Sequence, residues 1–203
     1  MCIGGLKVGI TGGIGVGKTT VCKLFEELGV PVYYSDAEAK RLMVEDMDLV
    51  GAIRRIFGDE AYSLEGELNR AWIAGVVFKD KGKLAALNGV VHPAVWRDGL
   101  RWSALHSDAP YTLKEAALIF ESGGDRYLDK IITVYSPMNV RIERLMARDQ
   151  STLSEIESRM KAQISEREKL KRSDFVIYNV EQGELLPQVL AIHKILIRFK
   201  VRG

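Results

Sequence analysis

The sequence predicts an α/β fold in which a parallel five-stranded sheet is flanked by helices and carries an inserted helical subdomain. A glycine-rich stretch at residues 6–21 joins an apolar, β-branched run to a helical pattern, as strand, loop and helix do in such folds. Further short runs rich in β-branched or aromatic residues follow along the chain, separated by helical patterns. The interval between the second and third runs is helical and longer than a simple crossover requires, which indicates the insertion.

The composition is typical of a globular protein, with 47% hydrophobic and 28% charged residues in a chain of 203 residues, enough for one core with an insertion. The net charge is only +2, so no overall field favours nucleic acid or an anionic membrane as the main partner. Cys2 and Cys22 have no metal-binding spacing and suggest no disulfide framework, as in a reducing compartment. No apolar run approaches the about 18 residues of a membrane span, and no leader pattern precedes the glycine-rich loop. We therefore expect a cytoplasmic protein.

The glycine-rich loop matches the pattern GxxxxGK[ST], in which Gly12, Gly17, Lys18 and Thr19 occupy the fixed positions. Glycines permit backbone dihedrals that let successive N–H groups turn toward a polyphosphate, and the following helix N-terminus adds unpaired N–H groups. Lys18 would reach the β- and γ-phosphates, and the Thr19 hydroxyl would bind Mg²⁺. The alternative is a turn that only joins strand to helix, but both a strand and a helix flank this loop. We therefore expect a nucleoside triphosphate site.

A short strand is expected at residues 31–34, after a helix whose apolar pattern ends at Leu28 with Gly29 as its C-cap. Asp36 follows this strand at the carboxyl edge of the sheet, the edge that also carries the phosphate loop. Its carboxylate could accept a proton from a substrate hydroxyl or hold Mg²⁺ through water. Ser35 or Asp36 could equally cap the helix that begins here. The residues alone leave both interpretations open.

Residues 37–105 show helical spacing and no convincing strand. Helices are expected at residues 51–57, 69–78 and 83–105, the last interrupted at His92-Pro93 because proline disfavours a helical residue before it. In a nucleotide-binding α/β protein, ligands gather at the carboxyl ends of the strands. An insertion over these ends is where a second substrate would bind.

The remaining elements return to the sheet. Strands are expected at residues 111–120, 130–135 and 175–178, and helices at residues 139–150 and from Gln182 onward. The first of these strands leads into Glu121 and glycines at a carboxyl edge, and Asn179 follows the last. The apolar stripe of the final helix should pack on the sheet.

The helix after the fourth strand carries Arg141, Arg144 and Arg148 on one face. Three arginines on one stripe can bridge phosphates. They can equally form a solvated face with Glu143 and Asp149 as partners, and the spacing alone favours this second interpretation.

Seven stretches carry a resemblance to a known family: ITGGIGVGKTTV at 10–21, SDAEAKRL at 35–42, LNRAWIAGVVF at 68–78, LNGVVHPAV at 87–95, ALIFESG at 117–123, RIERLMARD at 141–149 and SDFVIYN at 173–179. The phosphate loop is shared by many unrelated NTPases, whereas the HPAV and IFESG stretches are far more specific in this order and spacing. Together they resemble the dephospho-coenzyme A kinase family, over nearly the whole chain. The resemblance implies a P-loop NTPase fold with a helical substrate subdomain and a helical lid. It also implies transfer of the γ-phosphoryl group of ATP, with Mg²⁺, to the 3′-hydroxyl of dephospho-coenzyme A, the last step of coenzyme A biosynthesis.

The resemblance further implies roles for individual residues. Catalysis would fall to Lys18, Asp36 and Arg144. Nucleotide binding would fall to Gly13, Ile14, Gly15, Val16, Gly17, Lys18, Thr19, Thr20, Arg148 and Asn179, with Thr19 also on Mg²⁺. Acceptor binding would fall to Asp36, His92, Pro93 and Glu121. The family position thus favours catalysis over capping at Asp36, and a lid over a solvated face at the arginines.

The sequence departs from the family pattern at three positions. Tyr34 stands where the family often has the first Asp of Asp-Ala-Asp, so only Asp36 is left to act there. Lys40 stands where Arg or His is common, and Ala117 where Pro is common. These departures concern contacts to the acceptor and leave the expected reaction unchanged.

We expect a single domain at 1–203, with a core at 1–36, 111–137 and 173–203, a coenzyme A subdomain at about 37–110 and a lid at about 138–172. We expect a monomer or weak homo-oligomer that binds small molecules, and neither nucleic acid nor membrane.

Two alternative functions are a kinase of another nucleoside or nucleotide and a GTP-binding switch. The switch is disfavoured because the sequence contains no Asn-Lys-x-Asp guanine-reading motif. An ATPase acting on nucleic acid is disfavoured, because the basic run at 159–172 contains acids and no aromatic residue for base stacking.

Overall fold

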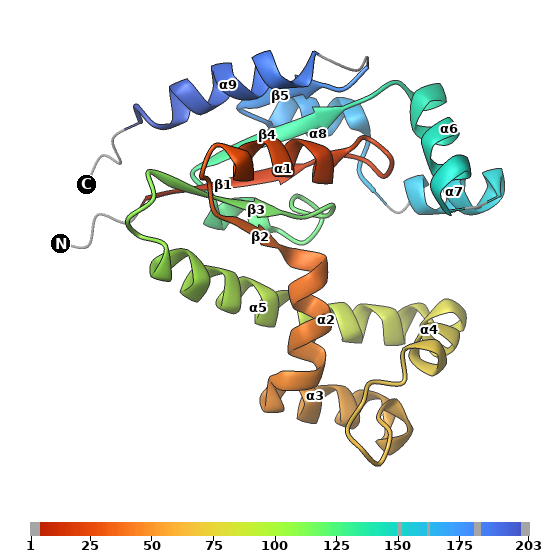
Figure 1. Ribbon diagram of the computed structural model, residues 1–203. Coiled ribbons are helices and arrows are strands. Elements are labelled where there is room, and N and C mark those ends of the chain that lie inside the picture. Colours follow the sequence, from red (N-terminus) through yellow and green to blue (C-terminus); the bar gives the residue numbers. More distant parts are fainter. Residues whose placement is uncertain (1–4, 150–151, 162, 181–183, 200–203) are drawn as a thin grey trace. The chain divides into compact units, whose positions relative to one another are not determined.

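The computed structural model describes residues 5–149, 152–161, 163–180 and 184–199 (Figure 1). The chain forms two compact units. The sheet unit consists of the residues up to Tyr33 and those from Trp102 onward, and the helical unit spans Tyr34–Arg101. Cys2, Gln150 and Gln182, which entered the predictions above, lie outside the described residues.

The sheet has five strands in the order β2-β3-β1-β4-β5. The strands are β1 (Leu6–Thr11), β2 (Val32–Tyr34), β3 (Tyr111–Glu115), β4 (Lys130–Tyr135) and β5 (Phe175–Tyr178). β1 pairs in parallel with β3 and β4, and β4 pairs in parallel with β5. The predicted parallel five-stranded sheet is confirmed. Because β1 is central, the loop that follows it opens at the middle of the carboxyl edge.

The helices α1 (Lys18–Glu27) and α9 (Leu185–Leu196) pack against each other over the sheet, as Figure 1 shows. Their buried faces are apolar: Val21, Cys22 and Phe25 on α1, and Val189, Ile192 and Leu196 on α9. The chain between β4 and β5 forms α6 (Met138–Asp149), α7 (Leu153–Lys161) and α8 (Glu166–Arg172), of which α8 packs on β4. These contacts fix both ends of the phosphate loop, since β1 and α1 are both anchored in the core.

The strand predicted at residues 111–120 is shorter in the structure. β3 ends at Glu115, and the following residues form turns in which the N–H groups of Ser122, Gly123 and Gly124 donate to nearby carbonyls. The prediction was wrong because the apolar Ile119 and Phe120 are buried in a cluster with Ile131, without strand pairing. A short helix, η2 (Gly124–Tyr127), then leads to β4.

The helical unit contains α2 (Ser35–Glu45), α3 (Met47–Phe57), η1 (Asp59–Ala61), α4 (Arg70–Lys79) and α5 (Lys81–Leu105), the last of which continues into the sheet unit from Trp102. Asp46 caps α3 by accepting from the N–H groups of Asp48 and Leu49, both at 3.1 Å. Asn69 caps α4 in the same way, accepting from the Trp72 N–H at 3.2 Å.

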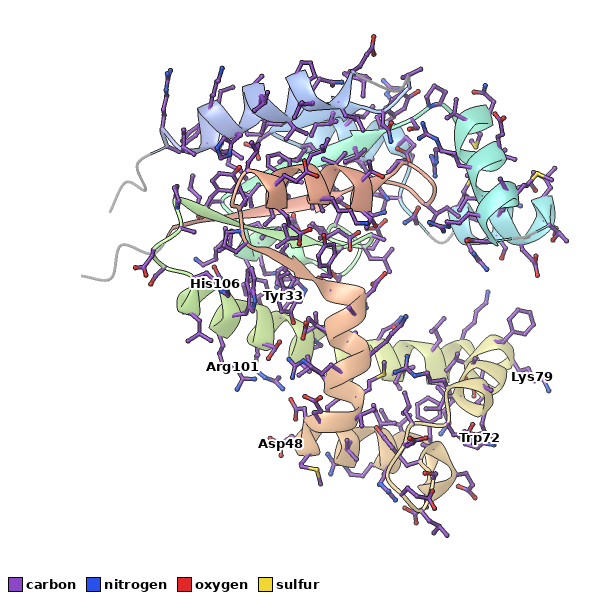
Figure 2. All side chains as sticks on the ribbon, viewed as in Figure 1. Tyr33, Asp48, Trp72, Lys79, Arg101 and His106 are labelled. Atoms are coloured by element: carbon purple, nitrogen blue, oxygen red, sulfur yellow. The ribbon has the colours of Figure 1, made fainter. Side chains whose placement is uncertain are left out.

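Three aromatic contacts involve the ends of these elements, and Figure 2 labels one ring of each, Trp72, Tyr33 and His106. Trp72 of α4 packs edge-on against Phe57 of α3, with ring centroids 6.4 Å apart. Within the sheet unit, Tyr33 of β2 packs edge-on against Trp102 at 5.5 Å, and Trp102 lies 4.2 Å from His106. The second contact ties the end of α5 to the sheet.

The interruption predicted at His92-Pro93 is absent, because α5 runs through Pro93 without a break. Proline in a helix interior removes one hydrogen bond and costs about 3 kcal/mol. The burial of Val91, Ala94 and Val95 around it offsets that cost. Tertiary packing therefore overrides the local signal.

The described residues include no helix long and apolar enough to cross a membrane.

Candidate active site

The phosphate loop occupies the six residues between β1 and α1. Gly12, Gly15 and Gly17 have φ of +148°, +79° and +87°, a region that side-chain-bearing residues rarely adopt. Gly17 is also the N-cap of α1 and offers no side chain to its N–H groups. The first turn of this helix therefore points uncapped donors and a positive dipole end at the loop, which is the arrangement that binds phosphate.

Lys18 folds over this loop. Its Nζ donates to the carbonyl oxygens of Gly12 at 3.0 Å and Gly13 at 3.3 Å. The ammonium thus lies among groups that frame the predicted phosphate site. Thr19 and Thr20 follow in the first turn of α1 and are exposed.

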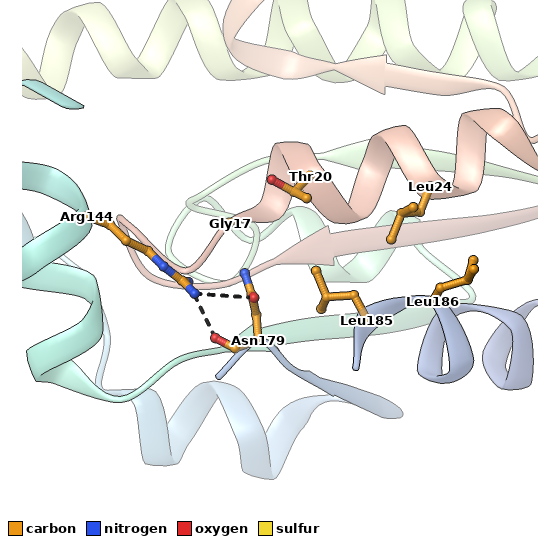
Figure 3. Close-up of a pocket in the computed structure, with 7 residues that line it drawn as sticks. All are labelled: Gly17, Thr20, Leu24, Arg144, Asn179, Leu185 and Leu186. Carbon is orange, nitrogen blue, oxygen red and sulfur yellow. Dashed lines mark hydrogen bonds between the residues drawn. The ribbon is translucent and has the colours of Figure 1, made fainter. Parts of the chain in front are cut away.

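A pocket of about 440 Å³ adjoins the loop (Figure 3). Its lining residues come from the phosphate loop, α1, α6, the end of β5 and α9: Gly17, Thr20, Leu24, Arg144, Asn179, Leu185 and Leu186. The leucines provide apolar walls from α1 and α9, and Arg144 and Asn179 provide the polar side. This combination suits a flat, partly polar ring next to a charged chain.

Asn179 connects the pocket to the loop. Its side-chain Nδ2 donates to the Val16 carbonyl at 2.8 Å, while its backbone carbonyl accepts from the Ser136 hydroxyl. Arg144 approaches the same residue, with Nη1 3.4 Å from the Asn179 backbone carbonyl oxygen and Nη2 3.5 Å from Asn179 Oδ1 (Figure 3). Arg144 Nη1 also lies 3.1 Å from Ser136 Oγ. The structure therefore brings Arg144 and Asn179 together beside the phosphate loop.

The three arginines of α6 have different surroundings. Arg148 is 71% exposed and pairs with Asp149 at 2.6 Å, as the solvated-face interpretation expects. Arg141 is only 3% exposed and pairs with Glu166 at 2.9 Å, so that interpretation is wrong for it. Arg144 lines the pocket. The three arginines, which their spacing places on one helix face, therefore differ in burial and in their partners.

Asp36 is the second residue of α2, in the helical unit. The N-cap is Tyr34, and no side chain caps this helix, so the capping interpretation of Ser35 and Asp36 is wrong. The Asp36 side chain is exposed. A carboxylate that does not cap its helix is available to a substrate.

His92 and Pro93 lie in the middle of α5, within the helical unit. His92 is half-buried, and this desolvation lowers the pKa of its imidazole from the ordinary value of 6.5. The ring is therefore neutral near pH 7 and offers one donor and one acceptor nitrogen.

Glu121 lies in the turns after β3 and has structural partners. Its Oε1 accepts from the Ile164 N–H at 2.9 Å and lies 3.6 Å from the Nζ of Lys169. The Lys169 side chain is fully buried, which lowers the pKa of its ammonium, while the charges of Glu121 and Glu166 oppose that shift. The predicted contact of Glu121 with the acceptor stays a prediction.

Sequence reasoning missed Glu115, the last residue of β3. It is 8% exposed and lies opposite Ile10 of β1, next to the strand that leads into the phosphate loop. Burial raises the pKa of the Cys22 thiol, and the charge of Glu115 raises it further, whereas Lys18 lowers it, so these groups share one electrostatic neighbourhood. A carboxylate at this place has the oxygen chemistry of a Mg²⁺ ligand. The sequence YTLKE does end in an acid. Because the strand was expected to continue to residue 120, Glu115 was not recognised as its last residue.

A family model, curated relatives and solved structures match this chain. A family model described as dephospho-CoA kinase matches residues 6–184. The dephospho-CoA kinase of Salinibacter ruber is 42% identical over 174 residues, covering 85% of this chain and 87% of the relative. A crystal structure of a Thermus thermophilus protein has a TM-score of 0.83 at 34% identity, covering 98% of this chain and all of that one (100%). The dephospho-CoA kinase from Campylobacter jejuni has a TM-score of 0.71 at 25% identity, covering 95% of this chain and 97% of that one.

Proposed function

Since this chain belongs to the dephospho-CoA kinase family, we propose a role for each part of its site in that reaction. The chain is a kinase that phosphorylates dephospho-CoA with ATP in coenzyme A biosynthesis. One observation carries the proposal: a phosphate loop with Lys18 folded over it adjoins a pocket bounded by Arg144 and Asn179. The triphosphate would lie on the loop and the adenine in the pocket.

Within Gly13 to Thr20, backbone N–H groups other than that of Ile14, which donates to Gln163 Oε1 at 3.2 Å, would hold the phosphates together with the N-terminus of α1. Lys18 would exchange its loop carbonyls for phosphate oxygens, which are stronger acceptors for an ammonium. Leu24, Leu185 and Leu186 would pack on the adenine ring, and Asn179 would offer hydrogen-bonding groups at its edge. Arg144 would lie between base and phosphates, with Arg148 further along the predicted lid.

Oxygen groups suited to Mg²⁺ lie on both sides of the loop. The Thr19 hydroxyl is exposed in the first turn of α1, and the Glu115 carboxylate ends the neighbouring strand. Hydroxyl and carboxylate oxygens are the ligand types that Mg²⁺ prefers, directly or through water. Bound there with ATP, the ion would neutralise charge on the phosphates.

Transfer of a phosphoryl group depends mainly on positioning and on stabilisation of charge. Lys18 and Arg144 would stabilise the negative charge of the transferred group. Asp36 would hold the 3′-hydroxyl of the acceptor and accept its proton. The helical unit, with His92 and Pro93, would bind the acceptor, and we expect Glu121 near it. The lid would exclude water that would otherwise hydrolyse ATP.

We expect the enzyme to work in the cytoplasm as a monomer or weak homo-oligomer, with small molecules as its partners. The net charge of +2 supports this expectation, because it gives no overall field that would favour nucleic acid.

The test is ADP release from ATP and Mg²⁺ with dephospho-CoA, adenosine, AMP or no acceptor. We expect stimulation by dephospho-CoA alone, and a product heavier by one phosphate whose 3′ position is identified by its fragmentation. Stimulation by adenosine or AMP would favour a kinase of another nucleoside or nucleotide. Turnover without an acceptor would count against the assignment of the helical unit.

A further inference from the structure

The outer side of the phosphate loop is held by side chains from residues 138–172. Both backbone polar groups of Ile14 are bonded in this way. Its N–H donates to Gln163 Oε1 at 3.2 Å, and its carbonyl accepts from Arg141 Nε at 2.8 Å. The two successive peptide units on either side of the Ile14 Cα are thus each fixed by a residue more than a hundred positions away.

Arg141 is itself fixed by an ion pair. Its Nη1 lies 2.9 Å from Glu166 Oε1, and only 3% of its side chain is exposed. A buried guanidinium is costly without a charged partner, so the Glu166 carboxylate stabilises Arg141 in this orientation. Glu166 therefore acts on the loop through Arg141.

The loop lies directly against this ion pair. A Cβ placed on Gly13 would collide with the Arg141 guanidinium and the Glu166 carboxylate. No side chain fits at position 13 while the pair is formed. Since the φ of Gly13 is not in the left-handed region, this contact, rather than backbone conformation, requires glycine there.

The backbone that carries Glu166 and Gln163 is itself held in place. Glu166 lies in the first turn of α8, whose N-cap Ser165 accepts from the Glu168 N–H at 3.2 Å. The segment that leads into α8 is tied down where the Ile164 N–H donates to Glu121 at 2.9 Å. Gln163 precedes this anchor, so its amide is held on a fixed backbone.

We propose that Arg141, Gln163 and Glu166 are positioning residues that set the phosphate loop for ATP before the nucleotide arrives. Two of the donor nitrogens of Arg141 are already used on Ile14 and Glu166, so its role differs from that of Arg144 in the pocket. A loop fixed in advance does not lose conformational freedom when it binds, which strengthens binding. The inference rests on the proposed role of the loop in binding ATP.

The experiment measures ATP binding by calorimetry with Mg²⁺ and no acceptor, using Glu166→Gln and Gln163→Leu in the full chain. Glu168→Gln is the matched control, because it makes the same change at an exposed site on the same helix. We expect the Kd for ATP to rise about tenfold to a hundredfold in both variants, the scale expected for a displaced binding group. In steady-state kinetics, the KM for dephospho-CoA should stay within about twofold of wild type.

Three outcomes would overturn the proposal. In the first, folded Glu166→Gln and Gln163→Leu bind ATP as tightly as Glu168→Gln does. In the second, the KM for ATP and the KM for dephospho-CoA rise by the same factor in these variants. If Glu166→Gln does not fold, Gln163→Leu decides alone, since it leaves the ion pair intact. The third is unchanged ATP affinity in Gly13→Ala, whose side chain displaces the pair. Failure of the wild type to bind ATP would instead overturn the proposed function.

Discussion

Asp36 projects its carboxylate from the first turn of α2 and does not cap that helix. With Tyr34 in place of the family's other acid, the proposed reaction depends on this one carboxylate. We predict that Asp36→Asn lowers kcat about a hundredfold or more, the usual contribution of a general base. The KM for ATP should stay near the wild-type value, because the nucleotide binds at the phosphate loop.

Initial rates with both substrates varied would test this prediction. Asp48→Asn is the control, since it removes an exposed carboxylate from the first turn of α3. Turnover of Asp36→Asn near that of the control would show that the hydroxyl is activated by another group.

Glu115 lies at the carboxyl end of β3 and, unlike Asp36, is almost fully buried. If it supports Mg²⁺ through water, Glu115→Gln should raise the Mg²⁺ concentration for half-maximal activity about tenfold or more. The measurement is a Mg²⁺ titration at saturating ATP and dephospho-CoA. Glu27→Gln, an exposed change on α1, controls for the lost charge. An unchanged titration curve would remove Glu115 from the metal site.

At the scale of elements, α5 places a half-buried histidine beside a proline in its middle. Burial lowers the pKa of His92 in the folded state below its ordinary value of 6.5. The unfolded chain therefore binds more protons as pH falls through that value, so this group destabilises the fold at acid pH. It has no such effect well above pH 6.5, where both states are neutral.

We predict that His92→Gln loses less stability than wild type between pH 7.5 and about pH 5.5. Thermal unfolding over this range would give the difference, and comparison between the two proteins cancels the titration of the carboxylates. A wild-type melting temperature that falls no faster than that of the variant would contradict the lowered pKa.

Local patterns were sufficient for the elements that are anchored at both ends. β1, the phosphate loop, α1, β4 and β5 could be predicted because their apolar periodicity and glycines coincide with their packing. The end of β3 could not, because Ile119 and Phe120 are apolar for a reason other than strand pairing. Local sequence does not say which buried partner an apolar residue meets.

The arginines of α6 show the same limit for the site. Arg141 and Arg148 share a helix face, yet one is buried against Glu166 and the other is exposed beside Asp149. Their difference is decided by segments far away in the chain, including Ile14 of the loop. Spacing identifies a possible phosphate stripe, but only tertiary contacts assign each member its role.

At the scale of the whole molecule, the chain leaves the sheet unit after Tyr33 and returns at Trp102. Each unit has its own buried residues and its own caps, so each substrate can be assigned to one of them. The nucleotide is assigned to the sheet unit through the loop and pocket, and the acceptor to the helical unit through Asp36 and His92. Both assignments are predictions.

Hydrogen exchange with each ligand added separately would test them. We predict that a non-hydrolysable ATP analogue slows exchange at residues 12–20 and around Asn179, because bound ligand opposes local opening. Dephospho-CoA should slow exchange within Tyr34–Arg101. Each ligand serves as the control for the other, because a general stabilisation of the protein would slow exchange at the same residues with both ligands. Protection by dephospho-CoA confined to the sheet unit would move the acceptor site away from α2 and α5, and with it the proposed roles of Asp36 and His92.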